Sequence, residues 1–120
     1  MLNDQFSVTL PLTGEYLTTV RLTTGGLCSL VGFDVDFIED YKVCVTESLL
    51  ILKRNGYVEA SIEFTVGEAL GCFVRGENRV GEKVDVTDDE ISRALLSALL
   101  GTVDFETDAN GEVCAIHFEG

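Results

Sequence analysis

The sequence predicts an α+β fold, a two-layer sandwich in which three helices cover one face of a mixed or antiparallel sheet, in the order β-α-α-β-β-α-β-β. Apolar residues recur at helical spacing in three segments and alternate with polar residues in the segments between and around them. Glycine, proline or asparagine-glycine turns separate many of these segments. Because the 120 residues include 46% hydrophobic residues and no linker-like stretch, we expect a single domain over residues 1–120.

The first strand and the first helix lie close together in the chain. Residues 6–10 alternate between apolar and polar side chains, as in a half-buried strand, and Pro11 ends the alternation. Helical spacing follows over residues 15–31. The pair Gly25 and Gly26 lies inside this helix, where it indicates either a bend or close packing against a neighbour.

The second helix is the clearest element in the sequence. Asp34 is placed as its N-cap, and Gly56 is placed just beyond its end. Lys53 and Arg54 lie in its last turn, where cations interact favourably with the helix dipole. Its apolar ridge repeats with a period close to 3.6 and consists of Ile38, Tyr41, Val45, Leu49 and Leu52.

Two alternating segments, residues 58–66 and 70–75, predict an antiparallel hairpin. The polar stretch 75–86 is predicted as a loop. Thr87-Asp-Asp-Glu90 then has the pattern of a capping box in front of a third helix that ends at Gly101.

The third helix carries four leucines that cannot all face one core. Some of them are therefore expected at the surface, where an exposed apolar patch indicates a protein interface. These leucines are Leu95, Leu96, Leu99 and Leu100. A second hairpin, residues 103–107 and 112–118, turns at Asn110-Gly111 and completes the sheet.

The chain is strongly acidic, with 8 basic and 21 acidic residues and a formal charge of −13. Such a charge repels phosphate backbones and anionic lipids, so we expect neither nucleic acid nor a membrane as partner. Two interpretations of the charge stay open. It either keeps a small domain soluble or attracts a partner that carries a basic patch.

The four cysteines show no metal-site spacing. They lie apart in apolar surroundings and are expected to be reduced core residues. The start of the sequence lacks the basic and apolar regions of a signal peptide, and no apolar run is long enough to span a bilayer. A cytoplasmic location is the corresponding expectation.

One stripe of the second helix combines three different side chains. Glu47, Ile51 and Asn55 follow one another at i, i+4 and i+8 and therefore share a face of the helix. A carboxylate and a carboxamide on either side of a branched hydrocarbon indicate a polar site that has lost part of its chemistry.

This stripe ends a longer pattern that resembles the anti-sigma factor serine kinases, members of the histidine-kinase-like (GHKL) ATPase superfamily. The matching segments are RLTTGGL at 21–27, GFDVDFIEDYKVCVTE at 32–47 and NGY at 55–57. The resemblance covers about residues 5–80, is densest over 20–57, and implies the same order of helices and strands.

The resemblance also implies roles for the stripe. Glu47 takes the position of a glutamate that polarises the reacting group, and Asn55 takes a histidine-like position one turn beyond the metal site. Ile51 replaces the asparagine that binds Mg²⁺ in the family. Because Mg²⁺ requires oxygen ligands and phosphoryl transfer depends on that ion, the replacement indicates a degenerate site.

Two further family elements differ from the pattern. Gly76 stands at the position of the aspartate that recognises adenine, with Glu77 beside it and Asn78 at a glycine position. Glu77 and Asn78, with the neighbouring glycines, form either a degenerate nucleotide-binding loop or an ordinary surface turn. The segment 95–101 lacks the expected Gly-x-Gly-Leu of the nucleotide lid.

Each candidate residue also has a plain structural explanation. Glu47 is either a catalytic base or a solvated helix carboxylate. Asn55 either contacts a cofactor or hydrogen-bonds the last carbonyls of its helix.

Three functions follow from these observations. The first is an anti-sigma-factor-like regulator with an eroded ATP pocket that binds a sigma factor or an anti-sigma antagonist. In that case no cofactor and no metal are expected, and the resemblance implies a homodimer. The second is a working ATP-dependent serine protein kinase, which would need ATP and Mg²⁺. The third is a domain that senses a small molecule without turnover.

Overall fold

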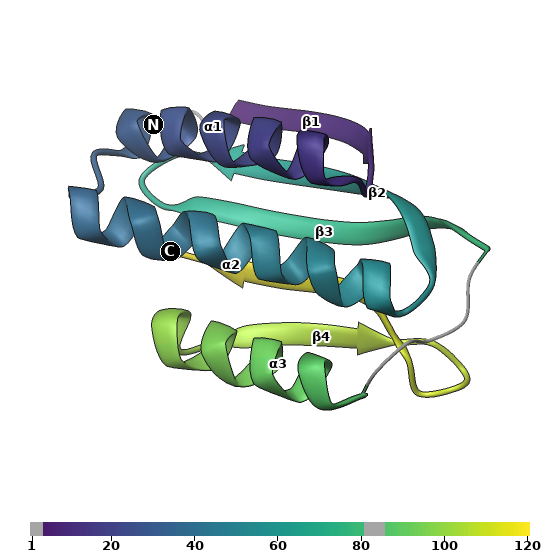
Figure 1. Cartoon of the computed structure of the whole chain (residues 1–120). Coiled ribbons are helices and arrows are strands. Elements are labelled where there is room, and N and C mark those ends of the chain that lie inside the picture. Colours follow the sequence, from purple (N-terminus) through teal and green to yellow (C-terminus); the bar gives the residue numbers. More distant parts are fainter. Residues whose placement is uncertain (1–3, 81–85) are drawn as a thin grey trace.

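A computed structural model, which describes residues 4–80 and 86–120, has two layers, with the helices on one side of a single sheet (Figure 1). The predicted fold class and order of elements are confirmed. The elements are β1 (Asp4–Pro11), α1 (Gly14–Val31), α2 (Val35–Arg54), β2 (Tyr57–Val66), β3 (Leu70–Arg79), α3 (Val86–Leu100), β4 (Val103–Thr107) and β5 (Val113–Glu119).

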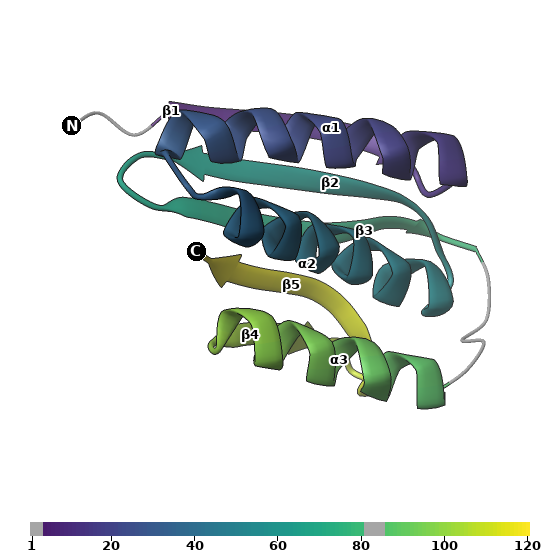
Figure 2. The same cartoon turned by 60° about the vertical axis from the view of Figure 1, so that its left-hand side comes forward.

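The sheet has five strands in the order β1-β2-β3-β5-β4. Every neighbouring pair is antiparallel, so the antiparallel form of the prediction is the correct one. The helices lie side by side over the sheet, with α2 in the middle of the layer (Figure 2). The core lies between the layers, and its largest fully buried side chains include Tyr41, Phe64 and Phe118.

The predicted ends of α2 are confirmed. Asp34 is the N-cap residue, and its Oδ1 accepts a hydrogen bond of 2.8 Å from the backbone N–H of Phe37. Asn55 is the C-cap residue, and Gly56 follows it with φ +95°, a backbone conformation that glycine adopts without strain. No helix in the described part of the chain is long and apolar enough to cross a membrane.

The two glycines in α1 have different environments. A Cβ atom at Gly25 would lie 2.8 Å from Lys42 Cε on α2, whereas a Cβ atom at Gly26 would meet nothing within 4 Å. Close packing against a neighbour therefore explains Gly25. The helix ends in a left-handed residue, Gly32, whose N–H donates to the carbonyls of Cys28 and Ser29.

The predicted loop 75–86 is wrong in its first part. β3 continues to Arg79, because Gly76, Glu77 and Arg79 pair with residues of β2. Asn78, also in this extension, has a positive φ of 54°. The partners come from a distant part of the sequence, so a polar local pattern does not indicate that these residues form a strand. Gly81 lies outside the described residues.

The start of α3 also differs from the prediction. The helix begins at Val86, one residue before the expected cap Thr87, and the side chains of Thr87 and Asp88 lie outside the described part of the chain. Its predicted end at Gly101 is confirmed by a φ of +83°. The expected exposed leucine patch is wrong: Leu96 is buried, Leu95 is half-buried, and Leu99 and Leu100 are half-buried and packed against the core.

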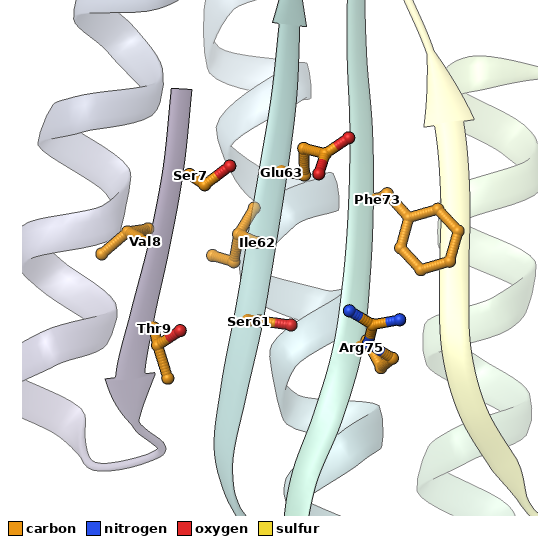
Figure 3. A pocket seen from close by; sticks show the side chains of 8 residues that line it. All are labelled: Ser7, Val8, Thr9, Ser61, Ile62, Glu63, Phe73 and Arg75. Carbon is orange, nitrogen blue, oxygen red and sulfur yellow. The ribbon is translucent and has the colours of Figure 1, made fainter. Parts of the chain in front are cut away.

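The face of the sheet opposite the helices is covered by no other element among the described residues. A shallow pocket of about 360 Å³ lies on this open face, across β1, β2 and β3 (Figure 3). Ser7, Ser61 and Glu63 line it from the first two strands, with Phe73 and Arg75 on the third. The Arg75 guanidinium lies 5.8 Å from the centre of the Phe73 ring.

Candidate functional site

The stripe of Glu47, Ile51 and Asn55 lies on the side of α2 that meets α3. Ile51 and Asn55 are fully buried, and the side chain of Glu47 is 24% exposed. Glu47 and Asn55 each hydrogen-bond a residue of α3, and Ile51 lies between them on the stripe. The arrangement follows from the period of the helix, which places positions four residues apart on one face.

Glu47 is bound by a serine of α3. The hydroxyl of Ser92 donates a hydrogen bond of 2.6 Å to Glu47 Oε2. Ser92 is only 2% exposed, so this bond is shielded from water. The carboxylate of Glu47 is consequently directed toward α3.

Arg54 joins the same contact from the last turn of α2. Its Nη1 lies 2.8 Å from Asp89 Oδ1, and its Nη2 lies 3.8 Å from Glu47 Oε2. The guanidinium also donates to Ser92 Oγ, over 3.2 Å from Nη1 and 3.0 Å from Nη2. One cation therefore lies between two carboxylates, and the serine hydroxyl bridges it to one of them. This arrangement compensates much of the cost of burying these charges.

Asn55 completes the contact at the end of α2. Its Nδ2 donates 2.7 Å to the Ile51 carbonyl and 2.8 Å to Asp89 Oδ2. The first bond is the helix-end contact expected for this residue. Its Oδ1 is buried and has no hydrogen-bond partner among the described residues.

We refer to Glu47, Arg54, Asn55, Asp89 and Ser92 as the α2–α3 polar cluster. Glu47 and Asn55 were predicted from the sequence as site residues, whereas Arg54, Asp89 and Ser92 were not. A signal was present: Asp89 and Ser92 share one stripe of α3 with the buried Leu96, at i, i+3 and i+7. Polar residues on the buried stripe of a helix indicate a polar partner on the neighbouring element.

Gly76 is shielded by an aromatic ring. A Cβ atom at this position would lie 2.5 Å from Tyr57 Cγ and 2.6 Å from two further ring atoms. The guanidinium of Arg79 lies 5.8 Å from the centre of the Tyr57 ring. Arg79 also forms an ion pair with Asp108 at 3.0 Å. Any side chain at Gly76, including the aspartate of the family, would therefore collide with Tyr57.

Glu77 and Asn78 lie in β3, away from the α2–α3 polar cluster. Glu77 Oε1 accepts a hydrogen bond of 3.1 Å from Ser61 and lies 3.5 Å from Arg75 Nε, and both partners line the open face of the sheet. Asn78 Nδ2 donates to Glu59 on β2. The structure brings Glu47 and Asn55 together, but it does not bring Glu77 to them.

The residues around Ile51 do not fit a magnesium ion. The side chain at the metal-binding position is a fully buried hydrocarbon. Among the described residues, no group of three or more histidine, cysteine, aspartate or glutamate side chains is arranged to hold a metal.

Comparison with known proteins gives one consistent similarity. No family model matches the sequence. The chain is similar to serine-protein kinases. It is 30% identical over 89 residues, 74% of its own length, to the serine-protein kinases RsbW of Bacillus thuringiensis strain Al Hakam, Bacillus cereus strain AH820 and Bacillus anthracis strain CDC 684 / NRRL 3495.

The aligned part corresponds to 51% of each of these relatives, so the chain spans about half of their length. The similarity supports the resemblance to the anti-sigma factor serine kinases that the sequence motifs indicate. The roles of Glu47, Asn55, Glu77 and Asn78 toward a nucleotide stay predictions.

Proposed function

We propose that this chain is an anti-sigma-factor-like regulatory protein whose ATP pocket is degenerate and which acts by binding a protein partner. The partner is a sigma factor or an antagonist of an anti-sigma factor, as in the family that the sequence resembles. Binding blocks the surface with which that partner would contact its own target. Such a partner places the protein in the cytoplasm.

The α2–α3 polar cluster is the observation that carries this proposal. The carboxylate of Glu47 contacts Ser92 and Arg54, and the amide of Asn55 donates to Asp89. The polar groups that a nucleotide site would present are therefore already bound to other residues of the chain. Ile51 between them supplies no oxygen ligand. A protein with this arrangement needs neither ATP nor Mg²⁺ to keep its fold.

The surface charge supports a basic partner. The chain as a whole carries −13, whereas the pocket on the open face of the sheet holds one carboxylate, Glu63, and one cation, Arg75, beside serine and threonine hydroxyls (Figure 3). Complementary charge increases the rate at which two proteins meet and excludes partners of like charge. Association with the partner is therefore expected to weaken as salt is added.

An active serine protein kinase is the second candidate. The specific observation in its favour is the 2.6 Å bond between Ser92 and Glu47, because a base that activates a substrate serine would accept a hydrogen bond of this kind. The relatives are also named serine-protein kinases. This alternative requires α3 to leave Glu47 and a different set of oxygen atoms to hold Mg²⁺.

Isothermal titration calorimetry with ATP and with ADP, each with and without Mg²⁺, separates the two candidates. The regulator is expected to give no heat of binding in any of the four titrations and to bind its protein partner equally well without nucleotide. Mg²⁺-dependent binding of ATP, followed by phosphate transfer to a serine of the partner, would instead establish the kinase.

Glu47→Ala is the informative variant for the kinase, with Glu39→Ala on the same helix as its matched control. Glu39 is exposed and forms a 3.1 Å ion pair with Lys42. Loss of phosphate transfer in the first variant alone would assign the reaction to Glu47. Failure of the unmodified protein to bind any sigma factor or antagonist would contradict the regulator.

A further inference from the structure

The pocket on the open face of the sheet is separate from the α2–α3 polar cluster, because it lies on the side of the sheet that the helices do not cover (Figure 3). Its volume of about 360 Å³ is within the range of sites that bind small molecules. Its described lining residues all belong to β1, β2 and β3, whose backbones are hydrogen-bonded to one another. The positions of these residues are therefore set by the sheet itself.

Strand pairing places two opposite charges in this pocket. Ser61 pairs with Arg75, and Glu63 pairs with Phe73. Glu63 and Arg75 are therefore diagonal neighbours, and diagonal positions in an antiparallel pair lie about 7–8 Å apart. Among the described lining residues, Glu63 is the only carboxylate and Arg75 the only cation. The pocket thus offers one group that attracts a positive charge and one that attracts a negative charge, with a gap between them.

These two charges do not neutralise each other. Arg75 forms its ion pair with Glu77, whose Oε1 lies 3.5 Å from Arg75 Nε, rather than with Glu63. The Arg75 side chain is still 62% exposed, so its guanidinium stays open to a ligand. Figure 3 shows the Glu63 carboxylate and the Arg75 guanidinium toward opposite ends of the pocket.

An aromatic ring adds an apolar surface beside the two charges. The ring of Phe73 is half-buried and lies 5.8 Å from the Arg75 guanidinium and 6.0 Å from the ring of His117 on β5. On β1, Ser7 and Thr9 line the pocket with exposed hydroxyls. The pocket therefore combines a carboxylate, a guanidinium, hydroxyls and one apolar wall.

We propose that this pocket binds a free α-amino acid that has an aromatic or branched apolar side chain. The ammonium group of the ligand donates to Glu63, its carboxylate accepts from Arg75, and its side chain lies against Phe73. A single carbon atom joins the ammonium and the carboxylate of an α-amino acid. Two charge-assisted hydrogen bonds of about 2.8 Å, with this short ligand between them, span about the distance between diagonal strand positions.

The charge of the chain favours a ligand without net charge. A chain of −13 repels a free anion such as phosphate. A simple cation is attracted to every exposed carboxylate of the chain and gains nothing from Arg75. A zwitterion pairs with both charges of the pocket and leaves neither unmatched, whereas the end charges of a longer peptide lie too far apart for this gap. Binding here is independent of the proposed regulatory function, because that function concerns a protein partner and the degenerate nucleotide site.

NMR titration of ¹⁵N-labelled protein with L-phenylalanine and with L-leucine tests the proposal. The amide signals of Glu63, Phe73 and Arg75 are expected to shift and to saturate, while those of α2 and α3 keep their positions. L-Phenylalaninamide lacks the carboxylate, and N-acetyl-L-phenylalanine lacks the ammonium. Each is expected to bind about tenfold or more weakly than L-phenylalanine, because one hydrogen bond to a charged group is lost.

Glu63→Gln and Arg75→Gln are each expected to weaken the binding of L-phenylalanine by about tenfold or more. Arg75→Gln should bind L-phenylalaninamide no more weakly than the unmodified protein does, since this ligand has no carboxylate to lose. The matched controls are Glu90→Gln and Arg21→Gln, which remove the same charges from exposed positions on α3 and α1.

The NMR spectrum of each variant shows whether it is folded, and the two ligand analogues test both charges in the unmodified protein. Three outcomes would each overturn the proposal. They are the absence of saturable shifts with both amino acids, equal binding of L-phenylalanine and its two analogues, and equal effects of the pocket and control variants.

Discussion

Ser92 Oγ lies 2.6 Å from Glu47 Oε2 and connects α3 to α2 at a buried position. The same hydroxyl accepts hydrogen bonds from Arg54. The most conspicuous candidate catalytic residue of the sequence is thus a structural partner of the third helix. The stability of this helix–helix contact is directly measurable.

Removing the hydroxyl is expected to destabilise the fold. Ser92→Ala leaves the Glu47 carboxylate without its donor, and urea denaturation should show a loss of about 1–3 kcal/mol in the free energy of unfolding. Ser97→Ala, at an exposed position of the same helix, is expected to change it by less than about 0.5 kcal/mol. Equal effects of the two variants would show that the bond contributes nothing.

A methyl group at Gly76 is expected to displace the ring of Tyr57. Because the added Cβ would lie 2.5 Å from Tyr57 Cγ, Gly76→Ala should cost about 1–3 kcal/mol of stability. Thermal or urea unfolding of Gly76→Ala in a Tyr57→Ala background should show a smaller cost, since the obstructing ring is absent. The control is Gly26→Ala, where a Cβ atom meets nothing within 4 Å and helix propensity predicts a gain of about 0.5–1 kcal/mol.

Restoring asparagine at position 51 is not expected to restore the metal site. Ile51 is fully buried, so Ile51→Asn places an amide in the core and should cost about 2–5 kcal/mol. Calorimetry with ADP should show no Mg²⁺-dependent binding in this variant, because Asn55 and Glu47 keep their partners on α3. The conservative variant Ile51→Val should lose about 1 kcal/mol. A stable Ile51→Asn protein that binds Mg²⁺ and nucleotide would contradict this account.

The buried cysteines are expected to make the protein less stable at alkaline pH. Burial raises the pKa of Cys28 from 9.0 to about 11 and that of Cys44 from 9.0 to about 12, and it also raises the pKa of Cys72. Above pH 9 the thiols of the unfolded chain ionise while those of the folded chain stay neutral. The buried, neutral thiols therefore make their full contribution to the free energy of unfolding below pH 9. This contribution is lost as the pH rises toward 12.

Urea titrations at a series of pH values test this dependence. A Cys28→Ala variant should show a shallower loss of stability above pH 9 than the unmodified protein. Ser97→Ala, at an exposed position and without loss of a thiol, provides the control and should leave the slope unchanged. Identical slopes for all three proteins would show that the buried thiols do not determine the alkaline transition.

The sequence predicted those elements whose signals lie within a few residues. Asp34 and Gly56 mark the ends of α2 through hydrogen bonds and backbone angles that depend on near neighbours, and the structure confirms both. The turn at Asn110-Gly111 follows the same rule, with Gly111 at a φ of +80°. With Thr87 as N-cap the third helix would begin at residue 88, but it begins two residues earlier, at Val86, because the ends of helices are less sharply encoded than their apolar faces.

The candidate site was predicted in part. The helical period by itself placed Glu47, Ile51 and Asn55 on one stripe, and these three residues do lie together. The same period places Asp89 and Ser92 on one stripe of α3, but it does not show that these residues, more than thirty positions later in the sequence, are the partners of Glu47 and Asn55. Docking of one helix on another depends on the shape of both surfaces and on the sheet beneath them, and no local pattern encodes that arrangement.

By itself, then, the sequence determined the order of helices and strands, the ends of α2 and the resemblance to a kinase family, because short-range spacing and turn chemistry control these features. Only the tertiary structure extended β3 to Arg79, turned Glu47 toward Ser92 and placed Tyr57 over Gly76. The physical reason is that strand pairing and helix docking join residues distant in the chain, so their outcome depends on the whole fold.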